Sequence, residues 1–156
     1  MRRPPRPVRA AGVSLLELLA VLVIVGVLAA LTYPTFQHHV VKAKRAEAQA
    51  ALMQLMQQQE RYYSQNNSYL TFSSASTDPD EKLFKWWSGQ GAAVASAYEI
   101  RATACVDDTI AQCVKLDAVP GTDKVDARFA DAACQTLTLT STGDKSASGP
   151  SPRCWP

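Results

Sequence analysis

Between residues 13 and 64, the hydrophobic residues first form an unbroken run and then recur with the spacing of a helix. Residues 13–31 are almost wholly apolar, and Glu17 is the only charged side chain among them. Beyond Pro34, apolar residues recur at intervals of three and four to about Ser64. The face that they form carries Val41, Ala48, Leu52, Leu55, Tyr62 and Tyr63. This pattern predicts one long helix with an apolar first part and an amphipathic second part.

From Ala97 onward, every second residue is apolar in three short stretches. The alternating positions are Tyr98, Ile100 and Ala102, then Val114 and Leu116, then Leu137 and Leu139. Such alternation predicts three strands of an antiparallel sheet with one face in water. Residues 65–96 between helix and strands show no clear period, and we expect their apolar stretch "KLFKWW" to pack onto the helix.

The four cysteines all lie in the last third of the chain. Three of them fall on the polar face of the expected strands. Four cysteines allow three pairings, and the strand pattern favours Cys105–Cys113, closing a hairpin, and Cys134–Cys154, tying the tail to the last strand. Their spacing matches no common zinc pattern and no histidine is near, so we expect no metal and no cofactor. Paired cysteines indicate an oxidising compartment.

Charge is unevenly placed along the chain. Arg2, Arg3, Arg6 and Arg9 precede the apolar run, and without them the 16 basic residues fall to 12 against 14 acidic ones. A mildly acidic globular part lacks the basic surface that nucleic-acid binding needs, so we do not expect direct nucleic-acid binding. We find no nucleophile elbow, phosphate loop, metal cluster or paired carboxylate motif, and therefore no sign of an enzyme.

Glu17 is the unexpected residue of the apolar run. As a helix, residues 13–31 would extend about 28 Å, close to the thickness of the hydrocarbon layer of a membrane. A charge at that depth costs about 2.5–3.5 kcal/mol on insertion scales. Glu17 therefore needs a partner of opposite charge.

A basic leader ending in Gly12, followed by "VSLLELLAVLVIVGVLAALTYP", resembles the class III signal of type IV pilins. The resemblance implies that prepilin peptidase cuts between Gly12 and Val13 and that Val13 becomes an N-methylated N-terminus. It implies that Glu17 is the conserved glutamate of assembly, which meets the Val13 amine of a neighbouring subunit. Gly26 and Pro34 match the positions that weaken the family's helix. The head and tail are most similar to minor pilins of the PilE kind.

The resemblance implies an α+β type IV pilin fold. A long N-terminal helix with a protruding apolar half would pack on a small antiparallel β-sheet head with a disulfide-stapled C-terminal loop. The expected parts are residues 1–12 as a cleaved leader, 13–34 as a transmembrane and filament-core helix, and 35–64 as the amphipathic helix of the head. Residues 65–96 would form the αβ-loop, and 97–156 the sheet and the disulfide-bounded D-region.

The implied function is that of a structural, minor subunit of a type IV pilus that supports adhesion, twitching motility or DNA uptake. Its partners would be other pilin subunits, the prepilin peptidase/N-methyltransferase, the pilus assembly machinery and the bacterial inner membrane. The head would lie in the periplasm and later in the extracellular pilus. Two alternatives remain open. One is a pseudopilin of type II secretion with calcium at "DPDE", residues 78–81, and the other is a competence pilin that binds DNA directly.

Overall fold

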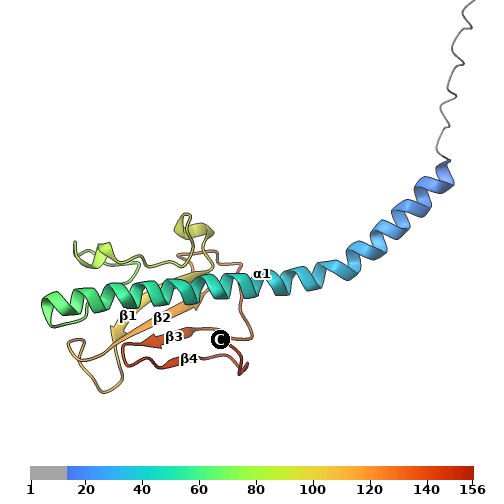
Figure 1. Ribbon diagram of the computed structural model, residues 1–156. Helices are drawn as coiled ribbons and strands as arrows, with labels where there is room; N and C mark the ends of the chain where they lie inside the picture. Colours follow the sequence, from blue (N-terminus) through green and yellow to red (C-terminus); the bar gives the residue numbers. More distant parts are fainter. Residues whose placement is uncertain (1–13) are drawn as a thin grey trace, which may run out of the picture. The chain divides into compact units, whose positions relative to one another are not determined.

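The computed structural model describes residues 14–156, and within its long helix the side chains of residues 31–35 are outside the description. The chain divides into two compact units, residues 1–39 and 40–156. Helix α1, Leu15–Asn66, belongs to both, so the expected single helix is present (Figure 1). It remains helical through Gly26 and Pro34, and bending or melting there on assembly remains a prediction.

The described part of the first unit is an apolar helix with its side chains in solvent. The large apolar residues between Leu15 and Leu28 have exposed fractions between 52% and 76%. Among the side chains that the structure describes, no helical stretch is both long and apolar enough to cross a membrane. The expected span, residues 13–34, includes Val13 and the side chains of residues 31–34, which are outside that description.

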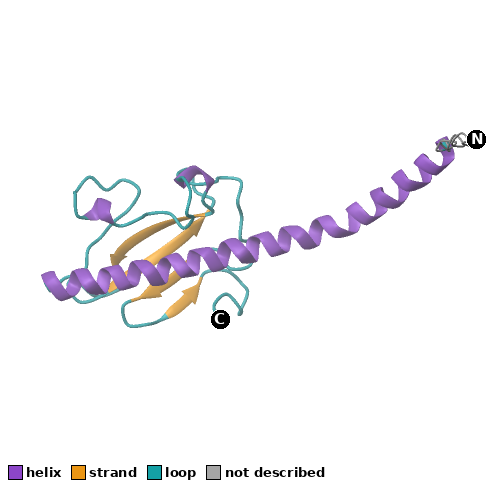
Figure 2. Ribbon diagram, turned by 45° about the horizontal axis from the view of Figure 1, so that its top comes forward, coloured by secondary structure: helices purple, strands orange, loops and turns teal. Residues whose placement is uncertain are grey.

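The second unit contains a four-stranded antiparallel sheet in the order β1-β2-β3-β4. The strands are β1 (Tyr98–Ala104), β2 (Val114–Pro120), β3 (Leu137–Thr140) and β4 (Lys145–Ala147). Two single-turn 3₁₀ helices, Glu81–Leu83 and Ala93–Ala95, interrupt the αβ-loop. The second half of α1 lies across one face of the sheet, as Figures 1 and 2 both show.

The core lies between that helix half and the sheet. In register, Ala102 stands opposite Leu116, and Leu116 opposite Leu139. These three side chains are buried, as are Leu52 and Leu55 of α1. The alternation of apolar residues in the strands and their helical spacing in α1 therefore meet in one core, as the sequence predicts.

The αβ-loop covers the open edge of β1. Phe72 forms a bridge with Ala102, and Trp87 forms one with Glu99. Phe84 is buried and its ring lies 6.2 Å from that of Tyr62 on α1. The expected packing of "KLFKWW" onto the helix is thus confirmed for Phe84. Because an unpaired edge strand invites aggregation, this cover also protects the sheet.

Two disulfides close the loops of the sheet: Cys105–Cys113, with Cα atoms 5.4 Å apart, and Cys134–Cys154, with Cα atoms 5.5 Å apart. The expectation that three cysteines lie on the wet face of strands is wrong. Each lies just outside a strand, and Cys113 and Cys134 are buried. In such turns the side chain's direction follows the local backbone and not the period of two of a strand. The fourth strand, β4, is not among the three that the sequence predicts.

Candidate functional site

Glu17 lies in the first turn of α1 and is exposed. A carboxylate is favourable there because the helix dipole places partial positive charge at the N-terminus. Gly12 and Val13 lie outside the described residues. The expected cleavage point, and the pairing of Glu17 with an amine at Val13, therefore stay predictions.

The polar centre of the head is the carboxylate of Asp131, which accepts four hydrogen bonds. Arg45 of α1 donates through Nε and Nη2, at 2.8 and 2.7 Å. The Tyr98 hydroxyl of β1 donates at 2.7 Å, and the Cys134 backbone N–H donates at 3.1 Å. The Asp131 side chain is fully buried and that of Arg45 is 13% exposed. The start of the disulfide-bounded tail is therefore tied to both helix and sheet.

These contacts decide the charge of each group in the cluster. Burial opposes ionisation of Asp131, but the hydrogen bonds from Arg45, Tyr98 and Cys134 outweigh burial and lower its pKa. Burial and the hydrogen bond to the Asp131 carboxylate raise the pKa of the Tyr98 hydroxyl. The hydrogen bond to Asp131 raises the pKa of Arg45 against the effect of burial. A neutral Tyr98 therefore shares a carboxylate with a charged Arg45.

The tail beyond Cys134 is held against the rest of the head by hydrogen bonds near its end. Gly149 donates its N–H to the Cys134 carbonyl at 3.0 Å, and Ser151 donates to the Ala133 carbonyl at 3.0 Å. The indole N–H of Trp155 donates to the Ser146 carbonyl of β4 at 2.8 Å. Gln49 of α1 donates to the Cys154 carbonyl. The Gly/Ser/Pro-rich tail is thus ordered by its disulfide together with contacts to α1 and β4.

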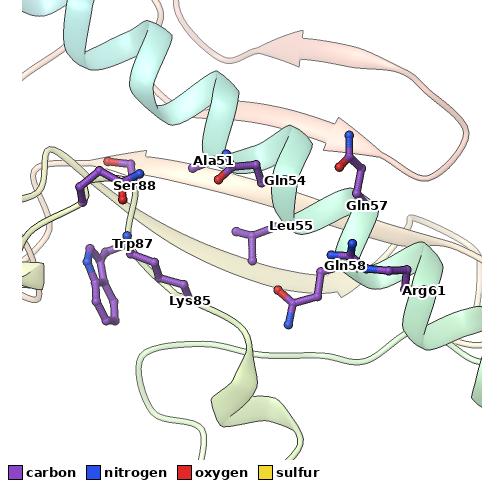
Figure 3. A pocket seen from close by; sticks show the side chains of 10 residues that line it. Ala51, Gln54, Leu55, Gln57, Gln58, Arg61, Lys85, Trp87 and Ser88 are labelled. Carbon is purple, nitrogen blue, oxygen red and sulfur yellow. The ribbon is translucent and has the colours of Figure 1, made fainter.

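A groove of about 290 Å³ runs between α1 and the αβ-loop. Leu55 lies at its base, Gln58 and Arg61 extend from the helix, and Lys85 and Trp87 extend from the loop (Figure 3). Among the described residues that line this groove, none carries a carboxylate. The groove therefore presents amide groups and cationic groups around a small apolar surface.

Two positions among the described residues carry side chains of metal-ligand type, and in both these side chains make other contacts. The carboxylate of Asp78 accepts the backbone N–H of Asp80 at 2.8 Å and faces that of Glu81 at 3.5 Å, so it caps a turn. The cluster of metal-ligand types found, Cys105, Cys113 and Asp108, consists of a disulfide and one exposed acid. A disulfide sulfur is not the thiolate that binds metals.

Sequence reasoning missed the Asp131 cluster. Arg45 stands three residues before Ala48 and so shares the buried face of α1, which is where a charged residue needs a buried partner. Gln59 gives the same signal, because it stands four residues after Leu55 and is fully buried. The position of Asp131, in an aperiodic stretch, gave no such signal.

Comparison with known proteins agrees with this architecture. A long N-terminal helix, an antiparallel four-stranded sheet and a disulfide-closed tail are the architecture of a type IV pilin. The family model described as "Type IV minor pilin ComP, DNA uptake sequence receptor" matches residues 34–138, and the chain belongs to this family of type IV minor pilins. Members of such a family are structural subunits and not enzymes.

A type IV pilin from Shewanella oneidensis was also found among solved structures, at 27% sequence identity and a TM-score of 0.46. The match covers 74% of this chain and 98% of that one. A comparison with curated proteins found no significant match.

Proposed function

We propose that this minor pilin is made as a membrane-inserted precursor, is cut between Gly12 and Val13, and then joins a type IV pilus through α1. The observation that carries the proposal is the exposed apolar face of residues 15–28 with Glu17 in the first turn. Water is an unfavourable environment for that much apolar surface. A bilayer before assembly and a helical polymer afterwards would each cover it.

Glu17 would fix the position of each subunit along the filament relative to its neighbour. After cleavage, a sister subunit would offer the α-amine of Val13 as a new positive charge for the Glu17 carboxylate. Because an unpaired charge in an apolar environment is costly, a subunit whose Glu17 meets that amine is favoured over one displaced along the filament. Other pilin subunits are then the main partners, with prepilin peptidase and the assembly machinery acting before them.

The substitution Glu17→Ala tests this assignment. We expect the leader to be removed normally and incorporation into sheared pili to fall at least tenfold, measured by immunoblot of pilus and membrane fractions. Asp123→Ala is the matched control, because it removes an acid whose side chain is 81% exposed and forms an ion pair with the adjacent Lys124. Normal incorporation of Glu17→Ala would contradict the proposal.

The proposal includes a location and roles that follow from the family. The precursor would cross the inner membrane once with its head in the periplasm, and the mature subunit would lie in the extracellular pilus. Adhesion, twitching motility and DNA uptake are the roles that a minor pilin of this kind would support. Deletion of the gene followed by separate assays of each would assign them.

Direct DNA binding is the second candidate function, because the matching family is described as a DNA uptake sequence receptor. Arg61 and Lys85 in the groove, and Lys42 and Arg153 elsewhere, take part in no ion pair within the described part of the chain. Against it stands the excess of acidic over basic residues in the head. Gel shifts with duplex DNA at 50 and 200 mM salt test it: specific binding that weakens with salt supports the candidate.

A pseudopilin of type II secretion is a third candidate function. It is not favoured by the way in which Asp78 caps the turn that follows it. Its carboxylate is occupied by backbone N–H groups of the turn that follows. A calcium-dependent rise in the melting temperature of the purified protein would support this reading. We expect the melting temperature to be the same with calcium and with chelator.

A further inference from the structure

We propose that the groove between α1 and the αβ-loop binds an acidic saccharide, through the carboxylate and hydroxyl groups of one or two sugar units. This inference goes beyond the role of a pilus subunit. It does not depend on assembly, because the residues that carry it all lie in the second unit of a single chain. The volume of the groove, about 290 Å³, lies just below the usual range for ligand sites, which begins at about 300 Å³, so the groove suits a small ligand.

The charge of the groove selects for an anion. Arg61 is exposed, and its guanidinium forms no ion pair within the described part of the chain. Lys85 donates to the Gly89 carbonyl, which occupies only one of the donors of its ammonium. Neither cation forms an ion pair with another of the residues that the structure describes. Each of these two cations can give charge-assisted hydrogen bonds to an anionic group of a ligand.

The aromatic wall of the groove is positioned by contacts within the αβ-loop. The indole N–H of Trp87 donates to the Gly91 carbonyl at 2.8 Å. Its ring lies 5.0 Å from that of Trp86 and 5.1 Å from the Lys85 ammonium. A fixed indole offers a flat apolar face at low entropic cost, and pre-organisation of this kind favours binding of a weakly apolar ring.

Amide groups complete the site on the helix side. Gln58 donates to the Leu83 carbonyl at 3.1 Å, which fixes its side chain and leaves its amide oxygen as an acceptor. Gln54 and Gln90 also line the groove. Amides both donate and accept, as vicinal hydroxyl groups do. Together with Trp87 they match the alternating polar edge and apolar face of a sugar ring.

The surroundings favour a small acidic sugar over a polyanion. From Gln65 onward the chain carries 8 basic and 11 acidic side chains. A long nucleic acid would meet this negative field over many phosphates, whereas a single carboxylate meets only the groove. The two cations also provide too short a track for a nucleic-acid backbone.

The test uses the full chain in detergent micelles and a matched pair of ligands, sialyllactose and lactose, titrated by calorimetry. They differ in the acidic sugar, so we expect sialyllactose to bind at least tenfold more tightly. Arg61→Gln and Lys85→Gln should each weaken sialyllactose binding at least fivefold, and Arg61→Gln should leave the melting temperature unchanged. Arg128→Gln is the control, because this side chain is 94% exposed and pairs with Asp126, and it should bind as the wild type does.

Four results would overturn the inference. They are no binding of sialyllactose, equal binding of lactose and sialyllactose, unchanged affinity in both groove variants, or displacement of the sugar by a short single-stranded oligonucleotide that binds more tightly. A failure of Glu17→Ala to affect pili would contradict the assembly proposal and leave this one intact, so the two are tested separately.

Discussion

Asp131 shows how a single residue organises the head. Its buried carboxylate joins α1, through Arg45, to β1, through Tyr98, and to the first turn of the disulfide-bounded tail, through Cys134. A buried charge is stable only when its hydrogen-bonding capacity is filled, and here it is. Of the cluster, the sequence could have indicated Arg45 by its place on the apolar face. It could not indicate Asp131, since only the fold brings that residue to the helix.

We expect Asp131→Asn to lower the free energy of unfolding by about 3 kcal/mol at neutral pH, because it leaves the largely buried guanidinium of Arg45 without an anion. Urea denaturation followed by circular dichroism measures the change. Asp123→Asn is the matched control, since its side chain is 81% exposed, and it should change stability by less than about 0.5 kcal/mol. Equal stability of the two variants would contradict the role given to Asp131.

The same carboxylate makes stability depend on pH. The pKa of Asp131 is lower in the folded than in the unfolded chain, so its contribution is complete above its ordinary pKa of about 4. It is lost as the pH falls through the lower, folded pKa. We expect the wild type to lose stability in this acid range more steeply than Asp131→Asn, measured by urea denaturation between pH 2 and pH 6.

At the scale of elements, periodic segments were predictable and aperiodic ones were not. The helix and strands β1 to β3 each carry enough apolar residues at regular spacing to reveal their type. Strand β4 has three residues, Lys145–Ala147, and no apolar alternation. Its conformation comes from pairing with β3 and from the cover provided by Trp155. The bridges of Phe72 and Trp87 to β1 are likewise tertiary contacts without a local signal.

Gln59 joins the end of α1 to the loop that follows it. Its side-chain amide donates to the Leu70 carbonyl at 2.6 Å and accepts the Leu70 N–H at 3.0 Å. We expect Gln59→Leu to lower the free energy of unfolding by about 2 kcal/mol, because it leaves both backbone groups unpaired. Hydrogen exchange of the Leu70 amide should accelerate in step. Gln57→Leu, at an exposed position of the same helix, should change neither.

The disulfide Cys134–Cys154 stabilises the tail element. It closes a loop with a sequence separation of 20 residues, which is worth roughly 3 kcal/mol in the chain-entropy model. We expect Cys134→Ala with Cys154→Ala to reduce stability by about that amount and to raise hydrogen exchange across residues 148–156. Replacement of Cys105 and Cys113 by alanine is the control, and it should leave exchange of the tail unchanged. If hydrogen exchange of the tail rises equally in the two double variants, the role given to Cys134–Cys154 is contradicted.

At the scale of the whole molecule, the sequence contains two regions with different environments. The described part of the first unit exposes its apolar side chains, and the second unit buries many of its own in a core. The helix, the antiparallel sheet and the pilin class were predictable because they follow from the spacing of apolar residues and from the motif around Gly12 and Glu17. The groove was not predictable, because the αβ-loop that forms one wall has no periodic pattern.

The account depends most on the retention of residues 13–31 in the mature protein. Intact mass measurement of the protein purified from membranes tests this directly. We predict a chain of residues 13–156 with one added methyl group and with four hydrogen atoms removed by the two disulfides. A mature chain that begins well beyond Leu31 would contradict the account, because the helix proposed for membrane insertion and assembly would then have been discarded.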